Sequence, residues 1–450
     1  MRARHLVGTP ATARRAAGGA LLVTGILVLA FNLRAMITGL PPVFPELQAV
    51  LHVSAGTLAA LAAVPVLCFG VFSGAGAPLS RRFGEERVLW VAVLLIAAGL
   101  VLRSLAPSAL LFPGTIVAGA GIALMNVLLP SLVKRRTPER AGLLIGLYLL
   151  ALAAGAIVGS ALAVPVFNAA GHELPAVRLT LGLWAGPAVV AAVVWLPQLR
   201  FRTVPAGPAP AEDADIAADL GVPAGPQPAA GRRQDGAGDR QGGAGRTGGS
   251  RAGALAMRRY RLAWQVTLFM GLQSLSYSAT LSWFPTMFRD RGVSAAYAGT
   301  LLAVMNLGNA ITALIVPVLA HRLPDQRWLA AGAMAATGAG LAGAGFGPSA
   351  LAAGSVLVLG LGQGATLGLG IYYTMARAPD PMTAASLSAF AQGVGYLIAS
   401  TGPLLIGFLH TATGGWTIPL TALLGVAVLQ LITGWLAGRA RTVPAGGPAG

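Results

Sequence analysis

A single arginine in the middle of a long apolar run is the residue of this sequence best placed to do chemistry. Arg34 lies in the run that begins near Gly18, within the stretch NLRAMITGL at 32–40. A guanidinium in hydrocarbon costs from roughly 3 to more than roughly 10 kcal/mol, so it persists only where a cavity, a partner or a ligand compensates its charge. Two interpretations follow: an anchor for an anion, or an arginine that locks helices together through backbone carbonyls.

The position of each polar side chain around the helix shows whether it shares a face with Arg34. Thr38 comes one turn after Arg34 and shares its face, whereas Asn32 lies about 200° away and is expected to bond a neighbouring helix. Gln273 and Tyr277 form another such stripe in a later run, and Gln392 and Tyr396 repeat the pattern.

Such polar residues either line a cavity or hold membrane helices together. As stripes that face a shared centre, they predict a binding site for a small solute. The predicted site consists of Arg34, Thr38, Asn126, Tyr148, Gln273, Tyr277, Asn306, Gln363, Gln392 and Tyr396.

No pattern typical of an enzyme is found in the sequence. All five His and all 14 acidic residues fall in predicted termini or loops, so the apolar runs hold no metal ligands or activated nucleophile. G-x-S-x-G, H-E-x-x-H and phosphate-binding motifs are absent. The one cysteine, Cys68, is expected to be inert packing. We therefore expect no enzymatic activity and no cofactor.

The composition indicates a polytopic membrane protein. Hydrophobic residues make up 55% of the chain and charged residues 10%, whereas soluble domains average about 25% charged residues. The net charge of +17 would suit nucleic acid only if the basic residues gathered on a soluble face. They fall instead between the apolar runs, which excludes a nucleic-acid partner and favours a lipid bilayer.

Twelve apolar runs are long enough to span a bilayer as helices, which needs about 20 residues each. The predicted fold is therefore all-α, with six helices, a linker and six helices. The predicted spans are 19–45, 55–78, 88–105, 109–133, 142–166, 179–197, 262–286, 296–320, 328–346, 349–375, 383–409 and 416–437.

The distribution of Lys and Arg predicts the orientation of these spans. With both termini in the cytoplasm, 26 of the 31 Lys and Arg lie on the cytoplasmic side. Only Arg103, Arg178, Arg289 and Arg291 lie outside, which leaves Arg34 alone within the membrane. Basic residues favour cytoplasmic loops. The prediction is a multi-pass protein of the inner or plasma membrane.

The segment between the two sets of runs is rich in Gly, Ala and Pro and has few large apolar residues. Such a segment cannot bury enough apolar surface to fold alone, so it is predicted to be a disordered cytoplasmic linker. The predicted division is an N-terminal cytoplasmic segment at 1–18, a six-helix bundle at 19–197, the linker at 198–260, a second bundle at 261–438 and a cytoplasmic tail at 439–450.

The two bundles are related by an internal repeat. A shift of 240 positions superposes Arg82 and Arg87 on Arg322 and Arg327, and Phe44-Pro45 on Phe284-Pro285. Parallel six-helix repeats are a known transporter architecture, with the substrate site near the midplane between the halves. The four arginines mark loops of mixed charge, which either set topology alone or latch the two halves together as a gate.

These loops and several segments of both halves resemble the major facilitator superfamily, and within it the cyanate/nitroimidazole transporter family, whose members are called cyanate permease-like. Ala77 and Arg81 depart from the superfamily loop motif, which usually has Gly and Asp there. The segments that carry the family resemblance are 32–34 (NLR), 37–38 (IT), 126–134 (NVLLPSLVK), Gly146-Leu147-Tyr148, 264–267 (WQVT), 273–274 (QS), 283–285 (WFP) and 388–396 (SAFAQGVGY).

The resemblance implies a secondary carrier of small solutes, of which cyanate or another small anion is the leading candidate. Arg34 would attract the anion in an alternating-access cycle. Efflux of drug-like or nitroaromatic compounds is the second hypothesis, and a non-transporting membrane receptor or scaffold is the third. A coupling proton is left open, with Glu46 as its nearest acidic candidate. We expect the carrier to act as a monomer.

Overall fold

The protein is described by a computed structural model, which covers residues 10–137, 140–201, 203 and 256–444. These residues form helices, and no strand is found among them. Most of the predicted linker, at 204–255, and the ends of the chain at 1–9 and 445–450 lie outside the described residues.

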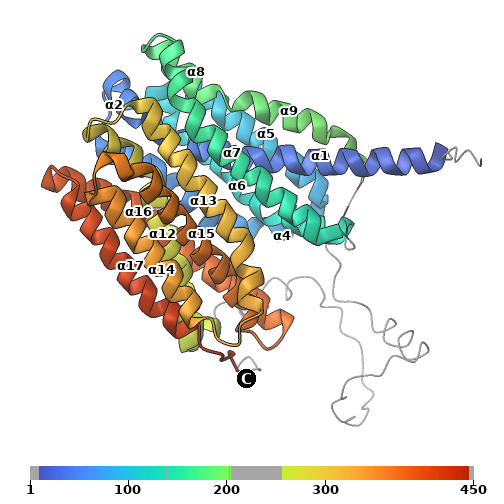
Figure 1. Ribbon diagram of the computed structural model, residues 1–450. Coiled ribbons are helices and arrows are strands. Elements are labelled where there is room, and N and C mark those ends of the chain that lie inside the picture. Colours follow the sequence, from blue (N-terminus) through green and yellow to red (C-terminus); the bar gives the residue numbers. More distant parts are fainter. Residues whose placement is uncertain (1–9, 138–139, 202, 204–255, 445–450) are drawn as a thin grey trace, which may run out of the picture.

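The helices form two groups along the chain (Figure 1). The N-terminal half contains α1 (Pro10–Thr38), α2 (Phe44–Leu51), α3 (Ala55–Phe72), α4 (Gly76–Phe83), α5 (Glu85–Leu105), α6 (Pro107–Arg136), α7 (Ala141–Ala169), α8 (Leu174–Gly182) and α9 (Ala185–Trp195). The C-terminal half contains α12 (Arg261–Asp290), α13 (Ala295–His321), α14 (Arg327–Phe346), α15 (Ala352–Ala376), α16 (Pro381–Thr413) and α17 (Thr417–Ala437).

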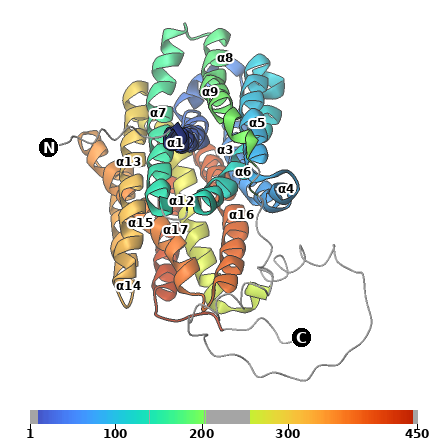
Figure 2. The same ribbon diagram turned by 90° about the vertical axis from the view of Figure 1, so that its right-hand side faces the viewer.

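The two halves repeat the same packing scheme, which confirms the repeat predicted from the sequence. In the first half α1 packs on α7, and α6 packs on α3 and α5; in the second half α12 packs on α16, and α15 packs on α13 and α14. The contacts between the halves follow the same symmetry, because α3 packs on α16 and α13 packs on α7. Figures 1 and 2 both show α7 beside α13.

Eleven segments of the described residues are long and apolar enough to cross a membrane. The helix α12 is also long, at 30 residues, but its Gln and Ser side chains lower its hydropathy. It lies between α16, α17 and α13, so these polar groups are shielded from lipid by other helices. The result agrees with the predicted twelve-helix fold.

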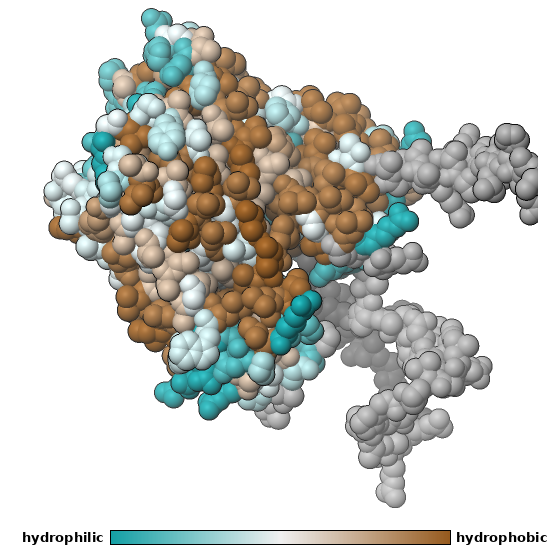
Figure 3. Space-filling view, in the orientation of Figure 1, coloured by the Kyte–Doolittle hydropathy of each residue, from teal (hydrophilic) through white to brown (hydrophobic). Residues whose placement is uncertain are grey.

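The outer surface of the helices is suited to lipid. Large apolar side chains such as Val71, Val193, Phe408, Val428 and Ile432 are exposed on it. Figure 3 shows apolar side chains over most of the visible face, with hydrophilic residues gathered towards its ends. In water such a surface would cause aggregation, whereas in a bilayer these side chains contact lipid tails.

Helix ends differ from the predicted spans where Gly and Pro interrupt the backbone. The first span ends at Thr38, because Pro41-Pro42 supply no backbone donors and continue as a short 3-10 turn into α2. The sixth span is divided into α8 and α9, with Gly182 at the end of α8 and Pro187 in the first turn of α9. These breaks change local direction without changing the number of crossings.

Glycines on α15 allow a close approach to α13. A Cβ atom at Gly360 would lie 2.1 Å from the Met305 carbonyl oxygen, and one at Gly364 would lie 2.0 Å from the Asn309 carbonyl oxygen. We expect Gly364→Ala to lower stability by about 1–3 kcal/mol, because the helices must separate. Thermal unfolding in detergent measures this effect, with Gly354→Ala as the control, since nothing lies within 4 Å of a Cβ there. Equal melting temperatures for the two variants would rule out the close approach.

Candidate functional site

Charged residues distinguish the two ends of the helix bundle. We call the end that carries Arg82, Arg87, Arg322 and Arg327 the basic end. The end that carries Glu46, at the start of α2, is called the opposite end. Arg34 of α1 lies near the middle of the membrane-spanning segment Leu21–Leu51.

At the opposite end the two halves are joined directly. Arg289 of α12 donates a hydrogen bond to the Glu46 carboxylate at 2.6 Å, and both side chains are largely buried. The rings of Phe44 and Trp283 meet edge to face there, with 6.1 Å between their centroids. These contacts close the space between the halves at this end.

At the basic end, the ion pairs found among the described residues stay within one half. Glu85 pairs with Arg135 at 3.6 Å and Glu86 with Arg136 at 3.3 Å, both inside the N-terminal half. In the other half, Arg327 pairs with Asp325 at 2.7 Å. A hydrogen bond from Arg327 lowers the pKa of the Asp325 carboxyl. No such pair crosses between the halves in the described part of the chain.

The predicted gating arginines follow this pattern. Arg82 lies over the ring of Phe83, and Arg327 over that of Trp435, each within its own half. Arg87 and Arg322 are exposed at helix ends. A latch between the loops therefore stays a prediction about a different conformation, one in which the two halves meet at the basic end.

Arg34 is half-buried, and few protein groups near its guanidinium could neutralise the charge. Among the described residues it has neither a hydrogen-bond acceptor nor an acidic partner, and its one aromatic contact is with Tyr277, 5.7 Å from the ring centroid. Tyr148 and Tyr396 also lie within electrostatic range of Arg34. Tyrosines from α7, α12 and α16 are thus close enough to this cation from α1 to interact with its charge.

On the N-terminal side of Arg34, the predicted residues Asn126 and Tyr148 come together. The Tyr148 hydroxyl donates to Asn126 Oδ1 at 3.4 Å, which joins α7 to α6. Tyr148 is buried, whereas Asn126 is half-buried. At this length the bond holds the hydroxyl only weakly.

On the C-terminal side, four predicted residues form two hydrogen-bonded pairs. The Tyr277 hydroxyl donates to Asn306 Oδ1 at 2.8 Å, and Gln273 Nε2 donates to the backbone oxygen of Gln363 at 3.4 Å. Asn306 Nδ2 and Gln363 Oε1 are buried and have no partner in the described part of the chain. One donor and one acceptor are therefore left for a ligand or a water.

Two predicted residues lie apart from this group. Thr38 is fully buried and donates to the Ala156 carbonyl oxygen of α7 at 3.0 Å, so its hydroxyl serves helix packing. Gln392 is exposed and donates to Ser388 on its own helix at 2.8 Å. Asn32 bonds the Pro187 carbonyl oxygen of α9 at 3.2 Å, which confirms that it contacts a neighbouring helix.

The structure corrects two statements about charged residues. The sequence predicts Arg103 on the outer side of the membrane and not within it, but it lies in the last turn of α5 and is only 1% exposed. Glu85 and Glu86 were assigned to a loop, but they are buried in the first turn of the same helix. Both errors arise at helix ends, where a sequence does not show which neighbouring helix covers the side chain.

The sequence analysis also missed an aromatic neighbour of the site. Phe69 of α3 lies beside Tyr396 of α16, with 5.4 Å between ring centroids. This contact joins the two halves near Arg34. No local pattern marks Phe69, because apolar residues surround it in a continuous run.

Comparison with known proteins connects this architecture to transporters. The family model described as Major Facilitator Superfamily matches residues 26–403. The chain is 36% identical to the 2-nitroimidazole transporter of Escherichia coli (strain K12), over 94% of this chain and 96% of that one. It is 28% identical to the cyanate transport protein CynX of the same organism, over 90% and 95%.

A solved structure with the same fold is that of a bacterial homologue of the human lysosomal transporter Spinster, in an inward-facing and unoccupied conformation. The TM-score is 0.72 at 16% sequence identity, and the match covers 95% of this chain and 99% of that one. At this identity the likeness concerns the fold alone.

Proposed function

Because the chain belongs to the major facilitator superfamily, we propose that it is a secondary transporter that carries a small anion, such as cyanate, past Arg34 by alternating access. The observation that carries this proposal is the half-buried guanidinium of Arg34, which has no acidic partner among the described residues. A buried charge without a partner is costly, and a bound anion would remove that cost.

The residues around Arg34 would complete the binding of the solute. A guanidinium donates in a planar fork, which suits an anion with a terminal oxygen or nitrogen. Tyr148, Tyr277 and Asn306 lie on both sides of it and offer further polar groups. Asn306 Nδ2 adds a buried donor without a partner among the described residues. Thr38 and Gln392 have no part in this arrangement.

Alternating access would operate through the symmetric contacts between the halves. The Glu46–Arg289 pair joins the halves at the opposite end, while the ion pairs found among the described residues at the basic end stay within one half. We place the basic end in the cytoplasm, since basic residues favour that side. The structure would then be open inward. Glu46 serves as part of the outer gate in this scheme, rather than as a proton carrier.

Export of nitroaromatic compounds is the second candidate function. Three tyrosines near Arg34, with Phe69 beside one of them, would form flat walls for an aromatic ring. A nitro group presents two oxygens that the Arg34 fork could bind. The 2-nitroimidazole transporter of Escherichia coli supports this candidate by its name and similarity.

Uptake by the purified protein in proteoliposomes tests the proposal. We expect vesicles that contain the protein to take up ¹⁴C-cyanate faster than protein-free vesicles, and unlabelled cyanate to compete. Competition by 2-nitroimidazole at equal concentration would support a shared site. Uptake of 2-nitroimidazole with none of cyanate would favour the second candidate.

We expect Tyr277→Phe to weaken solute binding while leaving the fold intact. The ring that faces Arg34 stays, but Asn306 Oδ1 loses the hydroxyl that donates to it at 2.8 Å. The half-saturating concentration of cyanate uptake should rise about three- to tenfold, the effect of one buried hydrogen bond. Tyr297→Phe is the control, since Tyr297 lies exposed on α13. If the two variants have equal half-saturating concentrations, the Tyr277 hydroxyl has no part in binding.

A further inference from the structure

A second arginine, Arg103, is buried without a counter-charge at some distance from the site described above. It lies in the last turn of α5 and is 1% exposed. Its Nε donates to the Leu181 carbonyl oxygen of α8 at 3.2 Å. Its Nη1 is buried and has no hydrogen-bond partner, and no carboxylate pairs with it, within the described ranges of the chain.

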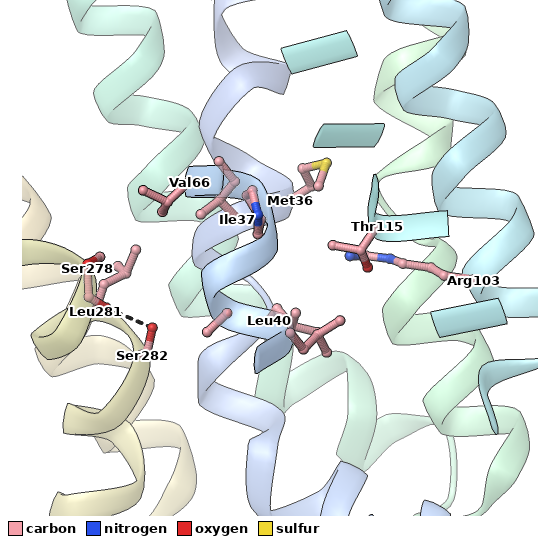
Figure 4. A pocket seen from close by; sticks show the side chains of 12 residues that line it. Met36, Ile37, Leu40, Val66, Arg103, Thr115, Ser278, Leu281 and Ser282 are labelled. Atoms are coloured by element: carbon pink, nitrogen blue, oxygen red, sulfur yellow. Dashed lines mark hydrogen bonds between the residues drawn. The ribbon is translucent and has the colours of Figure 1, made fainter. Parts of the chain in front are cut away.

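This guanidinium lines a cavity of about 30 Å³ between the two halves. The N-terminal half contributes Ile37, Pro65 and Thr115 to the lining, and the C-terminal half contributes Ser278 and Ser282. Figure 4 shows the side chains of Arg103 and Thr115 directed towards each other, with the serines of α12 on the other side of α1.

Arg103 is the one charged residue among the twelve described residues that line this cavity, and eight of the others are apolar. The hydroxyls of Thr115 and Ser282 donate to backbone oxygens at 2.7 Å, so their protons are used within their own helices. Ser278 likewise donates to the Ala399 carbonyl oxygen at 2.9 Å. The strong donor that is left is the charged Nη1 group of Arg103. A desolvated cation with a free N–H requires an acceptor, and an anion would also neutralise it.

The size of the cavity limits the occupant to a few atoms. A cavity needs about 10–15 Å³ of such volume to hold one water molecule, so this space suits a few waters or one small ion. The cavity is also close to Arg34 along α1. Ile37 follows Arg34 by three residues, which is about 4.5 Å of helix rise on the same face.

We propose that the Arg103 cavity is a second anion site, which binds a small monovalent anion on the path between the opposite end and Arg34. The proposal that Arg103 lies on the transport path rests on the proposed function. The proposal that Arg103 binds an anion does not. Because both halves line the cavity, its shape must change when they rock. In the conformation open at the opposite end, Arg103 would receive the anion and release it towards Arg34.

Anion-dependent thermal stability of protein that lacks Arg34 tests this site. Purified Arg34→Ala protein in detergent is titrated with sodium cyanate or sodium chloride, with sodium gluconate replacing them at constant ionic strength. We expect a saturable rise in melting temperature in Arg34→Ala, and none in Arg34→Ala/Arg103→Gln. A ligand that binds only the folded state stabilises it in this way. The charge control is Arg34→Ala/Arg178→Gln, which should keep the rise, since Arg178 is exposed on α8.

Several results would overturn the proposal. A rise that persists in Arg34→Ala/Arg103→Gln would place the anion elsewhere, and no rise in Arg34→Ala would mean that water alone fills the cavity. A rise with chloride but none with cyanate would refute the role on the transport path. Because this readout needs neither Arg34 nor transport, its failure is distinct from failure of the proposed function.

Two further variants keep the test decisive if Arg103→Gln protein does not fold. In the Arg34→Ala background, Arg103→Lys keeps the charge but loses the fork, so the half-saturating anion concentration should rise about tenfold. Thr115→Val is the matched control, because the Thr115 hydroxyl already donates to the Leu111 carbonyl oxygen, and it should leave that concentration unchanged. An unchanged half-saturating concentration in Arg103→Lys would contradict the proposed site.

Discussion

Replacing Arg34 by Ala is expected to abolish cyanate uptake in proteoliposomes, with a rate at least roughly 100-fold below wild type. The variant removes the charge that faces the solute, and a hydrogen bond to a buried charged group contributes about 3 kcal/mol, which corresponds to that factor. Arg34→Lys keeps the charge and loses the planar fork, so it should retain roughly one tenth of the rate.

The control for this prediction is Arg178→Ala, which removes a positive charge from an exposed position on α8. It should transport at the wild-type rate. Monodisperse behaviour in detergent establishes that the Arg34 variants fold. Wild-type uptake by well-folded Arg34→Ala protein would exclude a role of this guanidinium in solute binding.

Joining α2 to α12 at the opposite end is expected to stop transport almost completely. Glu46 and Arg289 form an ion pair at 2.6 Å that must separate if this end is to open. We expect Glu46→Cys/Arg289→Cys, in a Cys68→Ala background, to lose nearly all uptake after treatment with a short bis-methanethiosulfonate linker. Cys68 is the one native cysteine, so no other thiol interferes.

A reducing agent should restore uptake in the linked protein, because it cleaves the linker. Each single-cysteine variant, treated in the same way, should keep the activity it had before treatment. If linked protein transports at the unlinked rate, the two helices do not move apart during the cycle. The outer gate would then have to lie elsewhere.

The helices could be predicted well from the sequence because the bilayer demands about 20 apolar residues in each span. The repeat could be predicted because Arg82 and Arg87 recur as Arg322 and Arg327 at one offset. The break between α8 and α9 was missed, since the run 179–197 is uniformly apolar and its interruption depends on Gly182 and Pro187.

The site was only partly predictable, for reasons that differ between residues. Arg34 could be identified because a charged residue in the middle of an apolar run is costly and therefore rare. Thr38 shares a helical face with Arg34, but its hydroxyl donates to the Ala156 carbonyl oxygen of α7. The sequence around Thr38 does not show that α7 packs so closely there. The Glu46–Arg289 pair joins residues 243 positions apart, which only the packing of the halves brings together.

Burial of Arg103 was the largest error of the sequence analysis, and its cause is physical. The last turn of a spanning helix has the composition of a loop boundary, so an arginine there normally reaches water. Here α8 covers it, with Leu181 accepting its hydrogen bond. The membrane region thus contains a fully buried guanidinium, that of Arg103, besides the half-buried one of Arg34.

Competition in a counterflow experiment tests most directly whether a travelling solute neutralises Arg34. Wild-type proteoliposomes are loaded with unlabelled cyanate, and entry of external ¹⁴C-cyanate is measured with equal concentrations of external nitrate, thiocyanate or urea. We predict that both anions compete with the label and that urea, which is small and polar but uncharged, does not. Equal competition by urea, or no counterflow of cyanate at all, would contradict an anion site at Arg34.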